Sequence, residues 1–261
     1  MYSLAAVNNG DFSLVYQPQI DLNTGEIVAF EALVRWVHEG GGTMMPGEFI
    51  PLAEETGLIN EIGGWVLREA CRQAVAWRRA GYPPRRMAVN LSARQLMDKG
   101  FVELLVAILD ETGMDADALE LEITESQVMR QGEGSVALLN DIAALGVRLA
   151  VDDFGTGYSS LSYLKRLPFG TLKIDQSFVR DITVDPNDTA IVVAIISMAR
   201  SLDLEIIAEG IETAGQLTLL RAKGCTVGQG YFFSVPKSAD ELAPMLLRKS
   251  IFETQPAAYG T

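Results

Sequence analysis

The stretch VRLAVDDFGTGYSSLSYLK, residues 147–165, is the part of the sequence from which the fold can be worked out. Its apolar run ends in two adjacent acids, Asp152 and Asp153, and the turn GTG at residues 155–157 follows at once. Successive strand residues point to opposite faces, so two adjacent acids share one site only where the strand ends. Two close carboxylates repel each other unless a proton or a cation neutralises them. We therefore interpret the pair as part of a metal site; the alternative is a solvated acidic turn, and the other strand ends must decide.

A short apolar run followed by a helical pattern recurs along the 261 residues, with no linker or shift in composition between repeats. Such alternation predicts a parallel sheet, and about eight strands in a chain of this length predict an α/β fold of the TIM (β/α)8 barrel type. An open doubly wound sheet is the competing architecture, but it requires a glycine-rich turn after the first strand, which is absent. We expect strands near residues 12–20, 27–36, 87–92, 119–124, 147–153, 171–175, 204–210 and 225–231. We expect helices near residues 46–55, 59–80, 101–110, 136–145, 159–167, 188–201, 214–222 and 238–247.

Composition limits the class of protein. With 48% hydrophobic residues the chain can bury a large core, and we expect one domain over residues 1–250 and a disordered C-terminal tail over residues 251–261. The net charge of −13 argues against binding to DNA or RNA polymers, which requires a basic surface. Two distant cysteines, no signal peptide and no run long enough to span a bilayer favour a soluble cytoplasmic protein. The single histidine, His38, excludes a histidine-rich zinc site and is interpreted as a surface loop residue.

Polar side chains recur where the other expected strands end. In a barrel of parallel strands these ends converge on one face, which is where barrel enzymes place their chemistry. Several carboxylates in one mouth repel strongly without cations, so a full ring of them favours the metal site over the solvated turn. The ring consists of Glu31, Asn90, Glu122, Glu125, Asp152, Asp153, Lys173, Glu209, Glu212 and Gln229.

The donor atoms of this ring predict its chemistry. Carboxylate and amide oxygens, without histidine or thiolate, predict Mg²⁺ or Mn²⁺. Asp152 is placed to bridge two ions, and Asp153 to reach the second of them. Lys173, the only cation of the ring, is expected to hold a water molecule or a developing negative charge. Two ions and a held water predict in-line attack on a phosphoester.

One wall of the expected site belongs to the second strand. Glu31, Leu33 and Arg35 are two residues apart and therefore share a face of that strand. Arg35 is expected to bind a phosphate or to stack on a base.

Eight stretches, in order, closely resemble the EAL domain, a family that hydrolyses the bacterial messenger cyclic di-GMP (c-di-GMP) to linear 5′-pGpG. They are YQPQIDL, EALVRW, VNLSARQL, LELEITES, VDDFGTGYSSLSYL, LKIDQSFV, AEGIET and GQGYFF. The resemblance runs from about Leu4 to Met245, without a departure at any ligand position. It implies a modified TIM barrel whose first strand is antiparallel to the rest, and the turn at residues 23–25 suits such a hairpin.

The resemblance also implies a role for each residue of the ring. The residues implied to bind the first ion are Glu31, Asn90, Glu122 and Asp152, and those for the second are Asp152, Asp153 and Glu209. The implied catalytic set is Lys173, which would orient the attacking water, Glu209, which would assist its deprotonation, and Glu31. The implied substrate contacts are Gln17, Leu33, Arg35, Asn90, Asp152 and Gln229. Glu125 and Glu212 would support the ligands from outside, Glu125 by steadying the loop at residues 152–160.

Family members commonly form homodimers through the region of the apolar helix AIVVAIISMA, residues 190–199, so we expect a homodimer here. We also expect a covalently linked sensory or GGDEF-type domain in the native protein. Two alternatives remain open: an EAL domain that has lost catalysis and acts as a c-di-GMP receptor, and a different Mg²⁺-dependent barrel enzyme in which Lys173 abstracts a proton.

Overall fold

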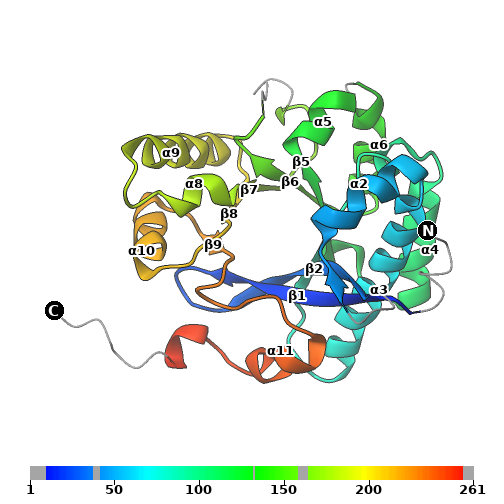
Figure 1. Ribbon diagram of the computed structural model, residues 1–261, viewed down its shortest axis with the longest axis horizontal. Coiled ribbons are helices and arrows are strands. Elements are labelled where there is room, and N and C mark those ends of the chain that lie inside the picture. Colours follow the sequence, from blue (N-terminus) through cyan, green and yellow to red (C-terminus); the bar gives the residue numbers. More distant parts are fainter. Residues whose placement is uncertain (1–9, 38–41, 132, 158–163, 255–261) are drawn as a thin grey trace.

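The computed structural model describes residues 10–37, 42–131, 133–157 and 164–254, and these form a closed barrel of eight strands with helices around it (Figure 1). β1 pairs antiparallel with both β2 and β9, which closes the barrel, and the other neighbouring barrel strands pair in parallel. The expected modified TIM barrel is thereby confirmed, and the open doubly wound sheet is excluded. A further short strand, β3 (Thr43–Met44), pairs with the end of β2. The barrel strands are β1 (Phe12–Asp21), β2 (Ile27–Val37), β4 (Arg86–Asn90), β5 (Leu119–Thr124), β6 (Arg148–Phe154), β7 (Thr171–Ile174), β8 (Glu205–Ala208) and β9 (Val227–Gly228).

The antiparallel start of the barrel depends on the turn between β1 and β2. Asp21 accepts two hydrogen bonds from backbone N–H groups of this turn, and Gly25 takes a φ of +75°, which glycine tolerates. A Cβ on Gly25 would also lie 2.3 Å from Ser250 Oγ, because the C-terminal segment packs against the turn. The backbone N–H of Ile251 donates to the carbonyl of Gly25, and η3 (Ile251–Thr254) is a 3₁₀ helix. Of the expected tail, residues 251–254 thus belong to the folded part, and residues 255–261 lie outside the described residues.

Helices cover the outside of the barrel, mostly where the sequence pattern predicts them. α5 and α8 were not expected, because with 7 and 5 residues they are too short to show a helical period. The expected helix at residues 159–167 lies mainly outside the described residues, and His38 lies wholly outside them. No helix in the described ranges is long and apolar enough to cross a membrane. The helices are α2 (Pro46–Thr56), α3 (Ile59–Arg79), α4 (Phe101–Thr112), α5 (Glu125–Gln131), α6 (Glu133–Ala144), α8 (Gln176–Arg180), α9 (Pro186–Ser201), α10 (Ala214–Lys223) and α11 (Ala239–Leu246), with the 3₁₀ turns η1 (Gln95–Met97) and η2 (Ala116–Ala118).

Small side chains inside the barrel make room for long polar ones. Ala29, Ala88 and Ala150 are fully buried on β2, β4 and β6, each two residues before a residue of the expected site and therefore on the same inward face. Their methyl groups leave space near the axis for Glu122 and Lys173, which are also fully buried or nearly so. The apolar residues of the opposite strand faces pack against the helices as the core.

A partly buried ion-pair cluster lies toward the amino-terminal ends of the parallel strands. Arg86 Nη1 lies 2.6 Å from a carboxylate oxygen of Glu205 and 3.6 Å from Glu120 Oε2, and Thr171 Oγ1 donates to that same Glu120 oxygen at 2.8 Å. Because Glu120 and Thr171 lie two residues before Glu122 and Lys173 on their strands, this cluster forms a layer directly beneath the expected site.

Candidate active site

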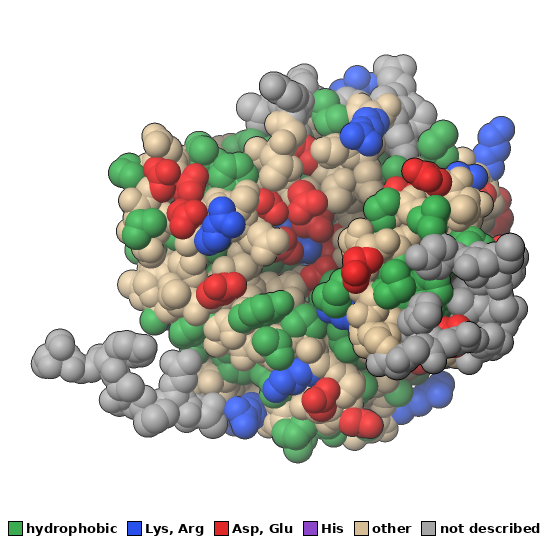
Figure 2. Space-filling model, viewed as in Figure 1, with side chains coloured by type: hydrophobic (Ala, Val, Ile, Leu, Met, Phe, Trp, Pro, Cys, Tyr) green, Lys and Arg blue, Asp and Glu red, His purple; other side chains and the backbone are tan. Residues whose placement is uncertain are grey.

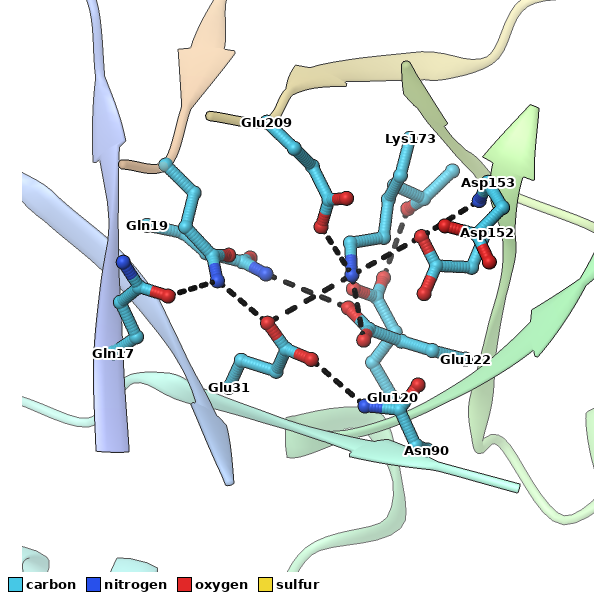
Figure 3. Close-up of polar contacts among 12 residues, drawn as sticks. Gln17, Gln19, Glu31, Asn90, Glu120, Glu122, Asp152, Asp153, Lys173 and Glu209 are labelled. Atoms are coloured by element: carbon cyan, nitrogen blue, oxygen red, sulfur yellow. Dashed lines mark hydrogen bonds and ion pairs between the residues drawn. The ribbon is translucent and has the colours of Figure 1, made fainter. Parts of the chain in front are cut away.

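The carboxyl ends of the parallel strands surround an acidic hollow. Figure 2 shows acidic side chains gathered around a basic one in a depression at the centre of this face. The residues that contribute to it come from β2, β5, β6, β7 and the end of β8 (Figure 3). The acids are Glu31, Glu122, Asp152, Asp153 and Glu209. These five acids and Lys173, out of the ring expected from the strand ends, are therefore brought together around one point.

Lys173 occupies the centre of this cluster. Its Nζ lies 2.7 Å from Glu122 Oε2 and 2.7 Å from Glu209 Oε1, within hydrogen-bonding distance of both. The same Nζ atom lies 3.4 Å from Asp152 Oδ1 and 3.9 Å from Glu31 Oε2. The lysine side chain is fully buried, so solvent does not screen these interactions.

A chain of amides holds Glu31. Asn90 Nδ2 donates to Glu31 Oε1 at 2.7 Å, and Gln229 Nε2 donates to Glu31 Oε2 at 2.5 Å and to Gln17 Oε1 at 2.9 Å. Gln17 in turn donates to the backbone carbonyl of Ser234. Each oxygen of Glu31 therefore accepts a hydrogen bond from one amide, that of Asn90 or that of Gln229, and the oxygen of the Asn90 amide is left to serve as a ligand.

Asp152 and Asp153 share the site through an irregularity in β6. The strand does not end at Asp153, as the sequence suggested, but continues to Phe154, and its register against β7 shifts between Val151 and Phe154. Asp153 has a φ of 53°, in the left-handed region that non-glycine residues rarely adopt. This local change of backbone direction brings two adjacent carboxylates to the same side of the strand, where a regular strand would separate them.

Glu125, the first residue of α5, holds the turn that follows β6. Its Oε2 accepts hydrogen bonds from the backbone N–H of Gly155 at 2.8 Å and of Gly157 at 3.3 Å. A Cβ on Gly157 would lie 3.0 Å from the carboxylate of Glu125, so the small residue permits this approach. The carboxylate of Glu212, by contrast, is exposed, although its backbone N–H is held by Gln216.

Burial and mutual repulsion shift the pKa values of the acids. Burial raises the pKa of Glu122 well above its ordinary value, with Lys173 opposing and the neighbouring acids reinforcing the shift. Burial likewise raises the pKa of Glu209, against the attraction of Lys173, and together with Asp152 it raises the pKa of Asp153 to about 6. Burial alone would raise the pKa of Glu31, but Lys173 and the amide donors lower it below its ordinary value. Protons are thus held weakly on Glu31 and more firmly on Glu122, Asp153 and Glu209.

The donor set fits hard divalent cations. Oxygens of Asp152, Asp153 and Glu209 lie within 4.8 Å of one another, so they can contact one ion. The five acids carry a formal charge of −5 and Lys173 carries +1, leaving −4, which two divalent cations would neutralise. Carboxylate and amide oxygens are the ligands preferred by Mg²⁺ and Mn²⁺.

The wall formed by β2 is arranged as expected from strand parity. Leu33 and Arg35 are both partly buried, and their cross-strand partners Val15 and Ser13 continue the register that pairs Glu31 with Gln17. Leu33 and Asn90 border a pocket of about 400 Å³ that extends between α2 and α3. Arg35 is near enough to Tyr231 and Glu31 for both to act on the pKa of its guanidinium, which burial lowers.

Two buried glutamines in or near the site were not predicted from the sequence. Gln19 is fully buried, and its Nε2 lies 3.5 Å from Glu122 Oε1, so it contacts a predicted ligand. Gln19 lies two residues after Gln17 on the same strand, so both side chains point to the same face, and this spacing could have identified Gln19 as a residue of the site. Gln216 lies in α10 and contacts backbone rather than site side chains, so no pattern of strand ends points to it.

Comparison with known proteins identifies relatives of the chain over most of its length. The family model described as the EAL domain matches residues 3–236. Over 237 residues the chain is 44% identical to the bifunctional diguanylate cyclase/cyclic di-GMP phosphodiesterase MucR of Pseudomonas aeruginosa, a match that covers 91% of this chain and 35% of MucR. Over 231 residues it is 45% identical to the cyclic di-GMP phosphodiesterase NbdA of the same organism, covering 88% of this chain and 30% of NbdA. The chain thus spans about a third of the length of these curated relatives.

Several solved structures with the same fold contain c-di-GMP. The PaMucR phosphodiesterase in complex with c-di-GMP superposes with a TM-score of 0.88 at 44% identity, covering 91% of this chain and 96% of the other. The FimX EAL domain of Pseudomonas aeruginosa bound to c-di-GMP superposes with a TM-score of 0.83 at 26% identity, covering 90% of this chain and 95% of the other.

Proposed function

Because this chain belongs to the EAL domain family, we propose that it hydrolyses c-di-GMP to linear 5′-pGpG and thereby lowers the concentration of this messenger. One water molecule is added across one P–O3′ bond, which leaves a 5′-phosphate and a free 3′-hydroxyl. The observation that carries the proposal is the convergence of four carboxylates on the buried ammonium of Lys173 at the mouth of the barrel, with the carboxylate of Asp153 beside two of them. The names of the relatives and the ligand of the similar structures support the same substrate.

The proposed ligands divide into two sets that share Asp152. Bound Mg²⁺ or Mn²⁺ ions would supply the Lewis acidity that activates a water molecule and neutralises charge on the phosphodiester. The chain's own contribution is to fix the ligands in advance, as the amides of Asn90 and Gln229 do for Glu31. The first set is Glu31, Asn90, Glu122 and Asp152, and the second is Asp152, Asp153 and Glu209.

In this proposal Lys173 acts as a fixed positive charge and Glu209 acts as the base. Burial favours the neutral amine, but Asp152, Glu122, Glu209 and Glu31 together raise the pKa of Lys173 well above its ordinary value. An ammonium that stays protonated cannot abstract a proton, so Lys173 orients the attacking water and stabilises negative charge on the phosphate. Glu209, whose pKa is raised, accepts the proton of that water at a carboxylate oxygen. Because Lys173 stays protonated, the alternative of a barrel enzyme in which Lys173 is the base is disfavoured.

The wall of β2 would hold the substrate. Arg35 offers a planar guanidinium that can pair with a phosphate or stack on a guanine, and Leu33 offers an apolar contact beside it. Gln229 donates hydrogen bonds to Glu31 and to Gln17, so these two buried amides fix the orientation of the Glu31 carboxylate beneath the substrate.

Chromatography of c-di-GMP incubated with the purified chain tests the proposal. We expect linear pGpG to appear with Mg²⁺ or Mn²⁺ and no product to form in excess EDTA, because the acids cannot activate water without cations. Product formation that persists in EDTA would contradict the metal requirement. Absence of product under all conditions, with calorimetry still showing c-di-GMP binding, would instead favour a receptor.

Metal binding is expected to weaken as the pH falls from 8 to 5. Burial raises the pKa of Glu209 to about 8, burial and the charge of Asp152 raise the pKa of Asp153 to about 6, and a protonated carboxyl is a poor ligand. Each of these two acids should therefore lower the Mn²⁺ affinity by up to about tenfold for each pH unit below its pKa. Electron paramagnetic resonance of free Mn²⁺ at pH 5, 6, 7 and 8 measures the effect. A dissociation constant that is unchanged from pH 5 to pH 8 would contradict it, and Asp153→Asn should show a shallower pH dependence than the unaltered chain.

We also propose a homodimer formed around α9 and the loop that precedes it. Ile191 and Val184 in this region are 39% and 77% exposed, which leaves apolar surface for a second copy to cover. A covalently linked domain is a further proposal, supported by the greater length of the relatives and by the second activity in the name of MucR.

A further inference from the structure

The loop that follows β8, residues 209–213, carries Glu209 and is held from two directions. On the side of β9, the backbone N–H of Ile211 donates to the carbonyl of Gln229, and the carbonyl of Ile211 accepts from the N–H of Phe232. Ile211 itself is fully buried. The loop is therefore attached to the segment that follows β9, which includes Gln229 of the amide chain.

Gln216 provides the attachment on the other side. Its Oε1 accepts hydrogen bonds from the backbone N–H groups of Glu212 and Thr213, both at 2.8 Å. Its Nε2 donates to the backbone carbonyls of Val179 at 3.2 Å and Arg180 at 3.0 Å, at the end of α8. The side chain is 4% exposed, and one buried amide thus connects the Glu209 loop to the helix that follows Lys173 in sequence.

The backbone of the same loop lies close to the start of α8. Gly210 has a φ of +69°, and a Cβ on it would lie 2.6 Å from Gln176 Cβ and 3.2 Å from Gln176 Cα. The N–H of Glu209 also donates to the carbonyl of Ile174, the last residue of β7. The position of the Glu209 carboxylate relative to Lys173 is therefore set by the packing of this loop on α8.

We propose that Gln216 is a positioning residue, which holds Glu209 at the metal site by fastening its loop to α8. The inference rests on the proposed function only in assigning Glu209 as a metal ligand. Partners of metal ligands outside the ligand shell typically contribute 10- to 100-fold to metal affinity or activity, because they fix the direction in which the ligand points.

The substitution Gln216→Glu separates this role from the start of α10. Gln216 is also the third residue of a capping box with Thr213, and glutamate serves equally well there because it accepts the same N–H hydrogen bonds. An ionised glutamate cannot donate to the carbonyls of Val179 and Arg180 and is repelled by them, so at pH 8, where the carboxyl ionises most readily, the connection to α8 is lost. The added negative charge would by itself strengthen cation binding, so weaker binding cannot be attributed to the charge.

Titration with Mn²⁺, followed by electron paramagnetic resonance, is the test. We expect Gln216→Glu to raise the Mn²⁺ dissociation constant about tenfold, with an unchanged circular dichroism spectrum. The control is Glu241→Gln, the reverse exchange in the capping box of α11, which should stay within about twofold of the unaltered chain. A dissociation constant for Gln216→Glu within twofold of the unaltered chain would overturn the proposal.

A second pair of variants keeps the proposal testable if Gln216→Glu fails to fold. Gly210→Ala pushes the loop away from α8, whereas Gly113→Ala imposes the same backbone cost, at a φ of +71°, with nothing within 4 Å of the new Cβ. We expect only Gly210→Ala to weaken Mn²⁺ binding, and equal binding by the two variants would overturn the proposal.

These measurements do not depend on turnover. If the unaltered chain binds Mn²⁺ but leaves c-di-GMP intact, the proposed function fails, while Gln216 is still judged from the dissociation constants. If the variant binds Mn²⁺ normally and the unaltered chain is active, the positioning role fails and the proposed function stands.

Discussion

Replacing Asp152 by Asn lowers kcat for c-di-GMP hydrolysis by at least about 1,000-fold, equivalent to about 4 kcal/mol of lost transition-state stabilisation. Asp152 is 7% exposed, its Oδ1 lies 3.4 Å from Lys173 Nζ, and it belongs to the group of acids that can contact one ion. It is also the residue proposed to bind both ions. The amide keeps the shape of the side chain but removes its charge, so both ions lose an anionic ligand at once.

Steady-state kinetics with Mg²⁺ at pH 8, together with Mn²⁺ titration, measure this effect. The matched control is Asp117→Asn, an identical exchange at an exposed acid in η2 at the opposite end of β5. We expect the control to retain the kcat of the unaltered chain and Asp152→Asn to bind Mn²⁺ more than tenfold more weakly. If Asp152→Asn turned over c-di-GMP at a tenth of the original rate or faster, Asp152 could not be the shared ligand.

The barrel and most of its site could be predicted because both follow from periodicity. Strand parity alone places Glu31, Leu33 and Arg35 on one face of β2, and the pairing of β2 with β1 in the structure agrees with this placement. The convergence of strand ends follows from parallel pairing, which places Glu122 beside Asn90, two residues that lie far apart in sequence. The local sequence pattern and the fold class were sufficient to predict where these residues lie.

The parts that escaped prediction depend on departures from periodicity or on contacts to backbone. The placement of Asp153 relies on a register shift and a left-handed backbone, neither of which its residue type signals. The amide of Gln216 reaches carbonyl groups of α8, which every sequence possesses, so its role appears only when the two elements are seen together. The position of Lys173 among four carboxylates was similarly not evident, since the sequence indicated its strand but not its distances.

That central position makes Lys173 a residue on which the fold depends as much as the chemistry. Replacing it by Met, which has a similar length and no charge, is expected to abolish turnover and to lower the free energy of unfolding in EDTA by about 3–5 kcal/mol. The cost arises because Glu122, which is buried, and Glu209, which is partly buried, each lie 2.7 Å from the ammonium and lose their counter-charge. Urea denaturation at pH 8 measures the loss, and Lys99→Met, at an exposed lysine, is the matched control.

The pH dependence and a second substitution distinguish this cause from lost packing. Without the ammonium, the pKa values of Glu122 and Glu209 rise further, so the folded protein binds protons that the unfolded chain releases at the same pH. A raised pKa in the folded state means that stability falls as the pH rises, and the deficit of Lys173→Met should therefore shrink between pH 8 and pH 5. In the double variant with Glu122→Gln, one unpaired carboxylate is removed, and we expect part of the stability to return, with a coupling energy of about 1–3 kcal/mol. A deficit that is equal at both pH values and unaffected by Glu122→Gln would show that Lys173 acts through its packing, and that its charge does not hold the acidic ring together.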